Sequence, residues 1–235
     1  MGGSAWGGSA PEGIAFDLDG TLYPNYRFYA RIIPFVFKHY RLVNAMGKAR
    51  TAMRRGPPPD GYEDRCFYGE QARLMAAALG ESPEAVKQKT EALIYRGWEP
   101  LFKRIKPYRH LRQTLEQLRG AGFKLGLLSD FPPENKLAHM ELDGFWDALL
   151  CSEVLGRLKP DPLPFRRLAE RLGLPPARIL YVGNSVPYDI KGAKQAGMKA
   201  ALIRPAWMPG HAGGADLVFS SYRRFSAYMA EGARQ

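Results

Sequence analysis

The sequence predicts an α/β protein whose core is a Rossmann-like parallel sheet interrupted by an inserted α-helical cap. Three observations support this fold class. A short apolar, β-prone segment stands near the start of the chain, and residues 23–106 after it have helical apolar spacing with few β-branched runs. From residue 107 onward, apolar segments of strand length alternate with helical ones, which is typical of a parallel sheet built from β-α units.

The size and composition of the chain are those of a globular protein. With 235 residues, 46% of them apolar, the chain is long enough for one large domain with an insertion, or for two domains. Residues 1–12 are rich in glycine and serine and are predicted to be a flexible tail. We therefore expect a core domain of residues 13–22 and 107–235, and a cap domain of residues 23–106.

Hydropathy and cysteine usage indicate a cytoplasmic protein. No run approaches 18 apolar residues, so no membrane span is expected, and the first residues lack the basic and apolar regions of a signal peptide. Cys66 and Cys151 lie far apart and show neither metal-ligand nor redox spacing. A reducing, cytoplasmic setting is the simplest inference.

Each element is predicted from its local pattern. In the cap, Ser82 followed by Pro83 indicates an N-cap and a first-turn proline, and residues 54–61 form a loop by composition. The expected strands are residues 13–18, 123–129, 148–151, 179–183, 199–203 and 217–219. The expected helices are residues 29–40, 63–79 and 83 to about 95 in the cap, and residues 108–121, a short one after Pro132, 164–172, 188–196 and 222–231 in the core.

The first strand leads into two carboxylates that are two residues apart. Asp17 and Asp19 should point to one side of an extended strand, at the end where parallel sheets bind ligands, and Gly20 lets the chain turn away. Two adjacent carboxylates repel each other unless a cation lies between them or one holds a proton. The pattern indicates a Mg²⁺-bound nucleophile beside a general acid/base. The alternative is a surface turn with two solvated acids.

Three later segments near strand ends also carry polar side chains. Ser129 and Asp130 end the second strand, where a hydroxyl and backbone amides can hold phosphate oxygens, although serine is also a common turn former. Lys159 precedes a proline and can neutralise a phosphoryl group, unless it is a solvated surface lysine. Asn184 and Asp189 follow an apolar strand and offer the oxygen atoms that Mg²⁺ prefers; Asp189 also suits a helix N-terminus.

These four segments, in this order, resemble the motifs of the haloacid dehalogenase-like (HAD) hydrolase superfamily. The first motif is the most specific, and it reads Asp17-Leu18-Asp19-Gly20-Thr21-Leu22. The resemblance covers about residues 13–220, with the helical insert directly after the first motif. It implies a HAD-like fold and an enzyme of the phosphatase branch, with a helical cap that selects the substrate.

The resemblance also implies a role for each motif residue. Asp17 matches the nucleophile that forms an aspartyl-phosphate, and Asp19 matches the general acid/base, whose backbone carbonyl also binds Mg²⁺. Ser129 and the amide of Asp130 match the position that orients the substrate phosphate, and Lys159 matches the lysine that stabilises its charge. The expected Mg²⁺ ligands belong to the first and last motifs: Asp17, Asp19, Asn184 and Asp189.

Asn184 departs from the family pattern, which has Asp at this position. Its amide oxygen can ligate a hard cation but brings no negative charge, so we expect weaker Mg²⁺ binding or a larger share for Asp189. Asp19 argues against a dehalogenase, because carbon–halogen cleavage needs no acid to protonate a leaving oxygen. The sequence predicts a Mg²⁺-dependent phosphatase of a small phosphorylated metabolite. A phosphomutase, a phosphonatase and a catalytically weakened binding or regulatory protein stay open.

The net charge of +11 is concentrated in the predicted cap. Residues 23–106 contain 16 Lys and Arg against 8 Asp and Glu. We interpret this surplus as attraction for an anionic substrate, with a solvated basic face as the alternative, and expect Tyr23, Tyr26 and Arg27 to reach the leaving group. No basic block or nucleic-acid-binding signature is present, so a nucleic-acid partner is not expected. Both a monomer and a homodimer fit the sequence.

Overall fold

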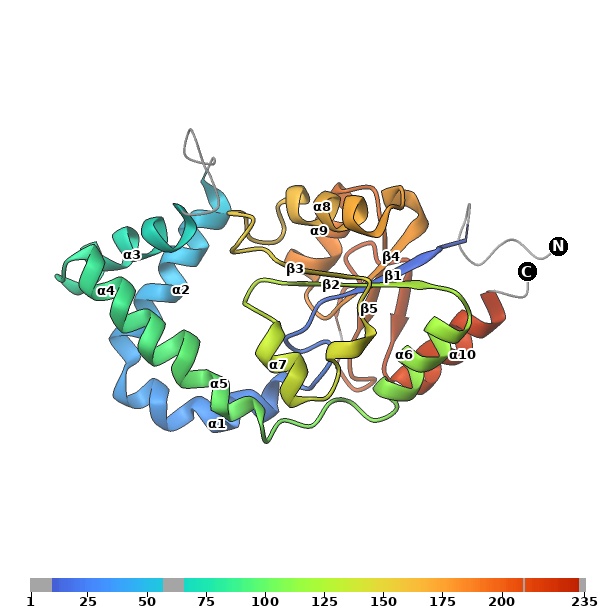
Figure 1. Ribbon diagram of the computed structural model, residues 1–235, viewed down its shortest axis with the longest axis horizontal. Coiled ribbons are helices and arrows are strands. Elements are labelled where there is room, and N and C mark those ends of the chain that lie inside the picture. Colours follow the sequence, from blue (N-terminus) through green and yellow to red (C-terminus); the bar gives the residue numbers. More distant parts are fainter. Residues whose placement is uncertain (1–9, 57–65, 209, 233–235) are drawn as a thin grey trace.

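The computed structural model describes residues 10–56, 66–208 and 210–232, and its core is a six-stranded parallel sheet (Figure 1). The strand order β3-β2-β1-β4-β5-β6 places the first strand in the middle, between β2 and β4. This sheet confirms the predicted α/β class with a Rossmann-like core. The strands are β1 (Gly13–Phe16), β2 (Lys124–Ser129), β3 (Ala148–Cys151), β4 (Ile179–Gly183), β5 (Lys199–Ile203) and β6 (Leu217–Phe219).

The helices of the core follow the predicted order along the chain. One helix begins two residues earlier than predicted, because the Asp161 side chain accepts a hydrogen bond from the amide of Leu163 and Pro162 occupies the first turn. These helices are α6 (Leu111–Gly120), α7 (Glu134–His139), α8 (Pro162–Leu172), α9 (Lys191–Gln195) and α10 (Tyr222–Gly232), with short turns at Asp143–Phe145, Pro176–Arg178 and Val186–Ile190.

Helices cover both faces of the sheet, which explains why its strands are almost continuously apolar. Ile14 and Phe16 point to the face that packs against α6 and α10, whereas Ala15 points to the face that packs against α8 and α9. Side chains alternate between faces along a strand. Figure 1 shows these two helix pairs on opposite sides of the sheet. The polar residues that follow the parallel strands lie at the carboxyl ends of the sheet, between these two helix layers.

The insert between β1 and α6 is helical and has a hydrophobic cluster of its own, built around Leu42, Met46, Met75 and Ile94. Among the residues that the structure describes, no helix is long and apolar enough to cross a membrane. The division of the chain into core and cap domains at residues 23 and 107 stays a prediction. The helices of the insert are α1 (Asn25–Lys38), α2 (Tyr40–Arg55), α3 (Cys66–Leu79), α4 (Pro83–Thr90) and α5 (Arg96–Phe102), with a π-helical turn at Glu91–Tyr95 between the last two.

Two predictions for the insert are wrong. The predicted helix 29–40 ends at Lys38, and a second helix, α2, follows after His39 and was not predicted. Arg54 and Arg55 belong to α2 rather than to the predicted loop, because Arg54 is held by hydrogen bonds to the core. The rest of that loop, residues 57–61, and the first residues of the predicted helix 63–79 lie outside the described residues.

Helix α2 contacts the core through Arg50 and Arg54, which are one helical turn apart. The Arg50 guanidinium pairs with Glu153, which follows β3 and is fully buried. The hydroxyls of Tyr95 and Tyr68 also donate to this carboxylate, at 3.0 and 3.3 Å. Burial raises the pKa of Glu153, although the Arg50 charge opposes this. The contact between the insert and the sheet domain thus contains a buried ion pair, whose carboxylate accepts hydrogen bonds from three side chains of the insert.

Replacement of Arg50 by methionine should destabilise the fold by about 3–5 kcal/mol, because it leaves the Glu153 carboxylate buried without its cation. The double variant Arg50→Met/Glu153→Leu should recover much of that loss, since it removes both charges. Urea unfolding measures both effects. Arg73→Met breaks an exposed pair with Glu70 and serves as the control, with little change expected. A double variant no more stable than Arg50→Met would contradict this account.

Candidate functional site

The candidate active site lies at the carboxyl ends of β1, β2 and β4. The register pairs Phe16 with Leu127 on one side and with Val182 on the other. The amide of Asp17 continues the ladder by donating to the carbonyl of Val182 at 2.9 Å. Because the three strands are parallel, the residues that follow them meet at one edge of the sheet.

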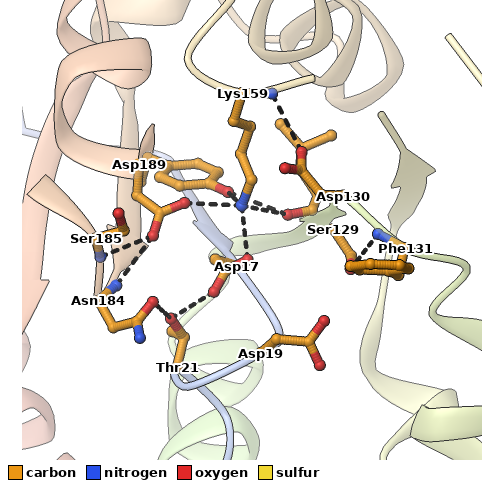
Figure 2. Close-up of polar contacts among 12 residues, drawn as sticks. Asp17, Asp19, Thr21, Ser129, Asp130, Phe131, Lys159, Asn184, Ser185 and Asp189 are labelled. Atoms are coloured by element: carbon orange, nitrogen blue, oxygen red, sulfur yellow. Dashed lines mark hydrogen bonds and ion pairs between the residues drawn. The ribbon is translucent and has the colours of Figure 1, made fainter. Parts of the chain in front are cut away.

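A buried lysine lies between two carboxylates at this edge (Figure 2). The Nζ atom of Lys159 is 2.6 Å from Asp17 Oδ1 and 2.7 Å from Asp189 Oδ1. It also donates to the hydroxyl of Tyr181 at 3.3 Å. Asp17, Lys159 and Asp189 are 5%, 3% and 1% exposed, so the ammonium is kept charged by these oxygens rather than by water.

Burial and ion pairing oppose each other in this cluster. Burial raises the pKa of Asp17 to about 7, although the Lys159 ammonium pulls it down. Burial disfavours the charged form of Lys159, but Asp17 and Asp189 outweigh it and raise the pKa of the lysine well above its usual value. Lys159 is therefore a fixed positive charge at neutral pH. A further cation beside Asp17 would favour the carboxylate form that a nucleophile needs.

Asp189 fixes both the lysine and the turn after β4. Its Oδ2 atom accepts hydrogen bonds from the amides of Asn184 and Ser185, at 3.1 and 2.9 Å. A Cβ atom added to Gly183 would lie 2.3 Å from the Asp189 Cβ, so this close approach requires glycine. Both carboxylate oxygens of Asp189 thus bind protein groups, and its role as a Mg²⁺ ligand stays a prediction.

The hydroxyl of Thr21 connects Asp17 to Asn184. The hydroxyl oxygen is 2.8 Å from Asp17 Oδ2 and 3.5 Å from Asn184 Oδ1. A carboxylate oxygen and an amide oxygen therefore both face this hydroxyl. Such oxygen donors fit Mg²⁺, which accepts carboxylate and amide oxygens and keeps several waters. In the described part of the chain no three His, Cys, Asp or Glu side chains are grouped to hold a metal ion. Two oxygens of the predicted ligand set lie outside such a group of side chains, namely the Asn184 amide oxygen and the Asp19 backbone carbonyl.

The chain turns directly after Asp17, which separates the two acids of the first motif. The amides of Thr21 and Leu22 bond to the carbonyl of Leu18 at 3.2 and 2.9 Å, and Gly20 has a φ of +90°. The strand therefore ends at Phe16 rather than at residue 18, and the expectation that an extended strand points both acids to one side is wrong. The Asp19 carboxylate points away from Asp17 (Figure 2).

Asp19 binds a lysine that the sequence did not single out. The Nζ atom of Lys136, on α7, is 2.7 and 2.8 Å from the two Asp19 carboxylate oxygens. The Tyr23 hydroxyl donates to the same carboxylate, and the Tyr23 side chain is only 1% exposed. The two acids of the first motif therefore have different lysines as partners.

Ser129 and Asp130 organise the loops around Lys159. The fully buried Ser129 Oγ accepts a hydrogen bond from the amide of Phe131 at 3.2 Å. Asp130 Oδ1 accepts from the amide of Lys159 at 3.1 Å, while Asp130 Oδ2 lies 2.7 Å from the Arg54 guanidinium. Arg54 also donates to the Lys159 carbonyl at 2.9 Å. That Ser129, Asp130 and Lys159 orient a substrate phosphate stays a prediction.

Sequence reasoning missed several residues at the site, and only some of them left a signal. Thr21 belongs to the first motif, and Glu153 is an acid that follows a strand. Both are polar residues near a strand end, which is the pattern that pointed to Ser129. Arg50 and Arg54 share a helix face through their spacing of four. Nothing in the sequence pointed to Lys136, because a lysine on a short helix is ordinarily solvated.

That Tyr26 and Arg27 reach the leaving group stays a prediction. Arg27 binds the segment in which the insert returns to the core, because its guanidinium donates to the carbonyls of Lys106 and Pro107. Tyr26 is 66% exposed on α1. Tyr23 contacts a site residue, because its hydroxyl donates to the Asp19 carboxylate.

Comparisons with known proteins agree with the fold and the motifs. The family model of haloacid dehalogenase-like hydrolases matches residues 11–197. Glyceraldehyde 3-phosphate phosphatase from Methanocaldococcus jannaschii is 36% identical over 202 residues, covering 82% of this chain and 84% of that protein. N-acetylmuramic acid 6-phosphate phosphatase from Pseudomonas aeruginosa is 28% identical over 219 residues, covering 88% and 89%.

Solved structures add a likeness in fold. The crystal structure of an HAD phosphatase from Thermococcus onnurineus superposes with a TM-score of 0.60 at 20% identity, covering 93% of this chain and 97% of that one. At this identity the superposition supports the fold alone. With the family match over most of the chain, and the motif residues at one sheet edge, the chain belongs to the haloacid dehalogenase-like hydrolases.

Proposed function

We propose that this enzyme is a Mg²⁺-dependent phosphatase that hydrolyses a small phosphorylated metabolite through an aspartyl-phosphate on Asp17. The observation that carries the proposal is the buried Asp17 carboxylate, paired with Lys159 at the carboxyl edge of the sheet. A nucleophilic carboxylate beside a fixed positive charge suits attack on an anionic phosphate ester, which would otherwise be repelled.

The reaction has two steps. An Asp17 oxygen attacks phosphorus, so that a bond forms from Asp17 to phosphorus while the bond from phosphorus to the ester oxygen breaks. Asp19 gives a proton to the departing oxygen and then takes one from the water that attacks the aspartyl-phosphate. This second attack releases inorganic phosphate and restores Asp17. Lys159 stays beside the negative charge that develops on the phosphoryl oxygens in both steps.

The metal-binding part of the proposal rests on the oxygen atoms around Thr21. Asp17, Asn184 and the carbonyl of Asp19 are the groups that we propose to hold Mg²⁺, with Asp189 supporting them through Lys159 and the turn after β4. When bound, Mg²⁺ would neutralise charge on the transferred phosphoryl group.

The substrate class is inferred from the relatives and from the cap. The relatives are named for the phosphate esters of a three-carbon aldehyde and of an amino sugar, both of them small metabolites. The Lys and Arg surplus of the insert supports an anionic substrate, although Arg50 and Arg54 are already paired with core acids. A phosphomutase, a phosphonatase or a weakened binding protein remains the alternative that the following tests address.

Asp17→Asn should abolish the release of p-nitrophenol from p-nitrophenyl phosphate, with a loss on the order of a thousandfold or more, because the nucleophile is gone. A chelator should abolish turnover by the parent enzyme, and added Mg²⁺ should restore it. The control Asp143→Asn changes an exposed acid and should behave as the parent. Turnover that survives Asp17→Asn would exclude the aspartyl-phosphate route.

Asn184→Asp should lower the Mg²⁺ concentration for half-maximal activity by about tenfold, since it adds one anionic ligand to a site whose affinity depends on ligand charge. Mg²⁺ titration of the steady-state rate measures this shift. The control Asn135→Asp adds the same charge on an exposed part of α7 and should leave the titration unchanged. An unchanged titration for Asn184→Asp would place Mg²⁺ away from this side chain.

A further inference from the structure

The first motif places its second acid, Asp19, in a small cluster at the junction of insert and core. We propose that Lys136, together with Tyr23, is a positioning residue that fixes the Asp19 carboxylate for proton transfer to the leaving group. The inference rests on the proposed function, in which Asp19 is the general acid/base. It assigns a task to a lysine that lies outside the four family motifs.

The contacts on Asp19 constrain its carboxylate strongly. Lys136 Nζ lies 2.8 Å from one oxygen and 2.7 Å from the other, so the ammonium binds both. Tyr23 donates its hydroxyl to the first of these oxygens. The Lys136 side chain is 12% exposed and that of Asp19 is 30% exposed, so the lysine is mostly shielded while the acid keeps access to solvent or a ligand.

Two aromatic rings hold the lysine against Asp19. The Nζ atom is 4.8 Å from the ring centre of Phe102 and 5.2 Å from that of Phe131, distances at which a cation is attracted to the ring face. Phe102 ends the last helix of the insert, and Phe131 follows the second motif of the core. An ammonium beside two apolar rings finds an anion in few directions, and Asp19 occupies one of them.

The same cluster includes both chain segments that connect the insert to the core. Tyr23 lies just after the first motif, and its ring meets that of Phe102 edge to face at 6.0 Å. One connection therefore contacts the other directly beside Asp19. The orientation of the acid is tied to the way the insert meets the core, through Tyr23 on one side and Phe102 with Lys136 on the other.

This arrangement has a defined chemical consequence. When Asp19 gives its proton to the departing oxygen, the bond from phosphorus to that oxygen breaks, and the transfer requires the carboxyl group to be aimed at that oxygen. The contacts from Lys136 and Tyr23 fix the orientation of the carboxyl group for this transfer. An alkoxide leaving group needs this proton, whereas p-nitrophenolate leaves readily without it. Loss of Lys136 should therefore harm alkyl esters much more than p-nitrophenyl phosphate.

The test compares kcat/KM for ethyl phosphate and p-nitrophenyl phosphate. Lys136→Met should lower kcat/KM about 10–100-fold for ethyl phosphate and about threefold or less for p-nitrophenyl phosphate. Lys136→Arg, which can still donate to both oxygens, should recover most of the loss, and Tyr23→Phe should show a smaller loss with the same preference. The control Lys194→Met removes an exposed lysine paired with Asp216 and should leave both values unchanged.

Each outcome bears on a different statement. An equal loss for both esters, or no loss at all, in soluble and folded Lys136→Met protein would overturn the positioning role while leaving the phosphatase intact. If Lys136→Met does not fold, the ester preference of Tyr23→Phe decides the matter in the same way. A parent enzyme that hydrolyses neither ester would overturn the proposed function and this inference with it, whereas the expected split between esters supports both.

Discussion

The geometry of the site depends on one buried positive charge, the ammonium of Lys159. A charge without water is tolerated only where anionic or dipolar groups surround it, and here Asp17 and Asp189 do so at 2.6 and 2.7 Å. The backbone of the same residue is fixed as well, because Asp130 accepts from its amide and Arg54 donates to its carbonyl. Lys159 thereby joins the ends of three strands to the insert, and the other site residues take their positions around it.

Two lysines give two neighbouring acids different surroundings. Asp17 shares the buried ammonium of Lys159 with a second acid, whereas Asp19 binds Lys136 in a partly exposed cluster. The buried place suits the nucleophile of the proposed reaction, and the partly exposed place suits its acid/base, which must reach both a leaving group and a water molecule. The end of the strand at Phe16 and the turn at Leu18 produce this division, because the chain is no longer extended between the two acids.

The insert meets the core through paired charges rather than through apolar surface alone. Arg50 and Arg54 neutralise Glu153 and Asp130, so part of the positive charge of α2 is used inside the protein. Arg54 also donates to the carbonyl of Lys159, whose ammonium donates to Asp17, so a charge contributed by the insert lies two hydrogen bonds from Asp17. A continuous chain of polar contacts therefore connects the insert to the site.

The sequence alone determined the fold class, the strands and the motif residues, because apolar periodicity and turn chemistry are local signals. Strands such as Ile179–Gly183 were predicted to the residue, and the parallel order brought Asp17, Lys159 and Asp189 to one edge as expected from strand ends. Which charged side chains pair with one another was decided by the tertiary structure alone. That Lys136 binds Asp19, that Glu153 is buried against Arg50, and that Arg54 stays helical to reach Asp130 all depend on segments far apart in the chain. No local pattern encodes such distances, because the free energy of a buried charge depends on its neighbours in space.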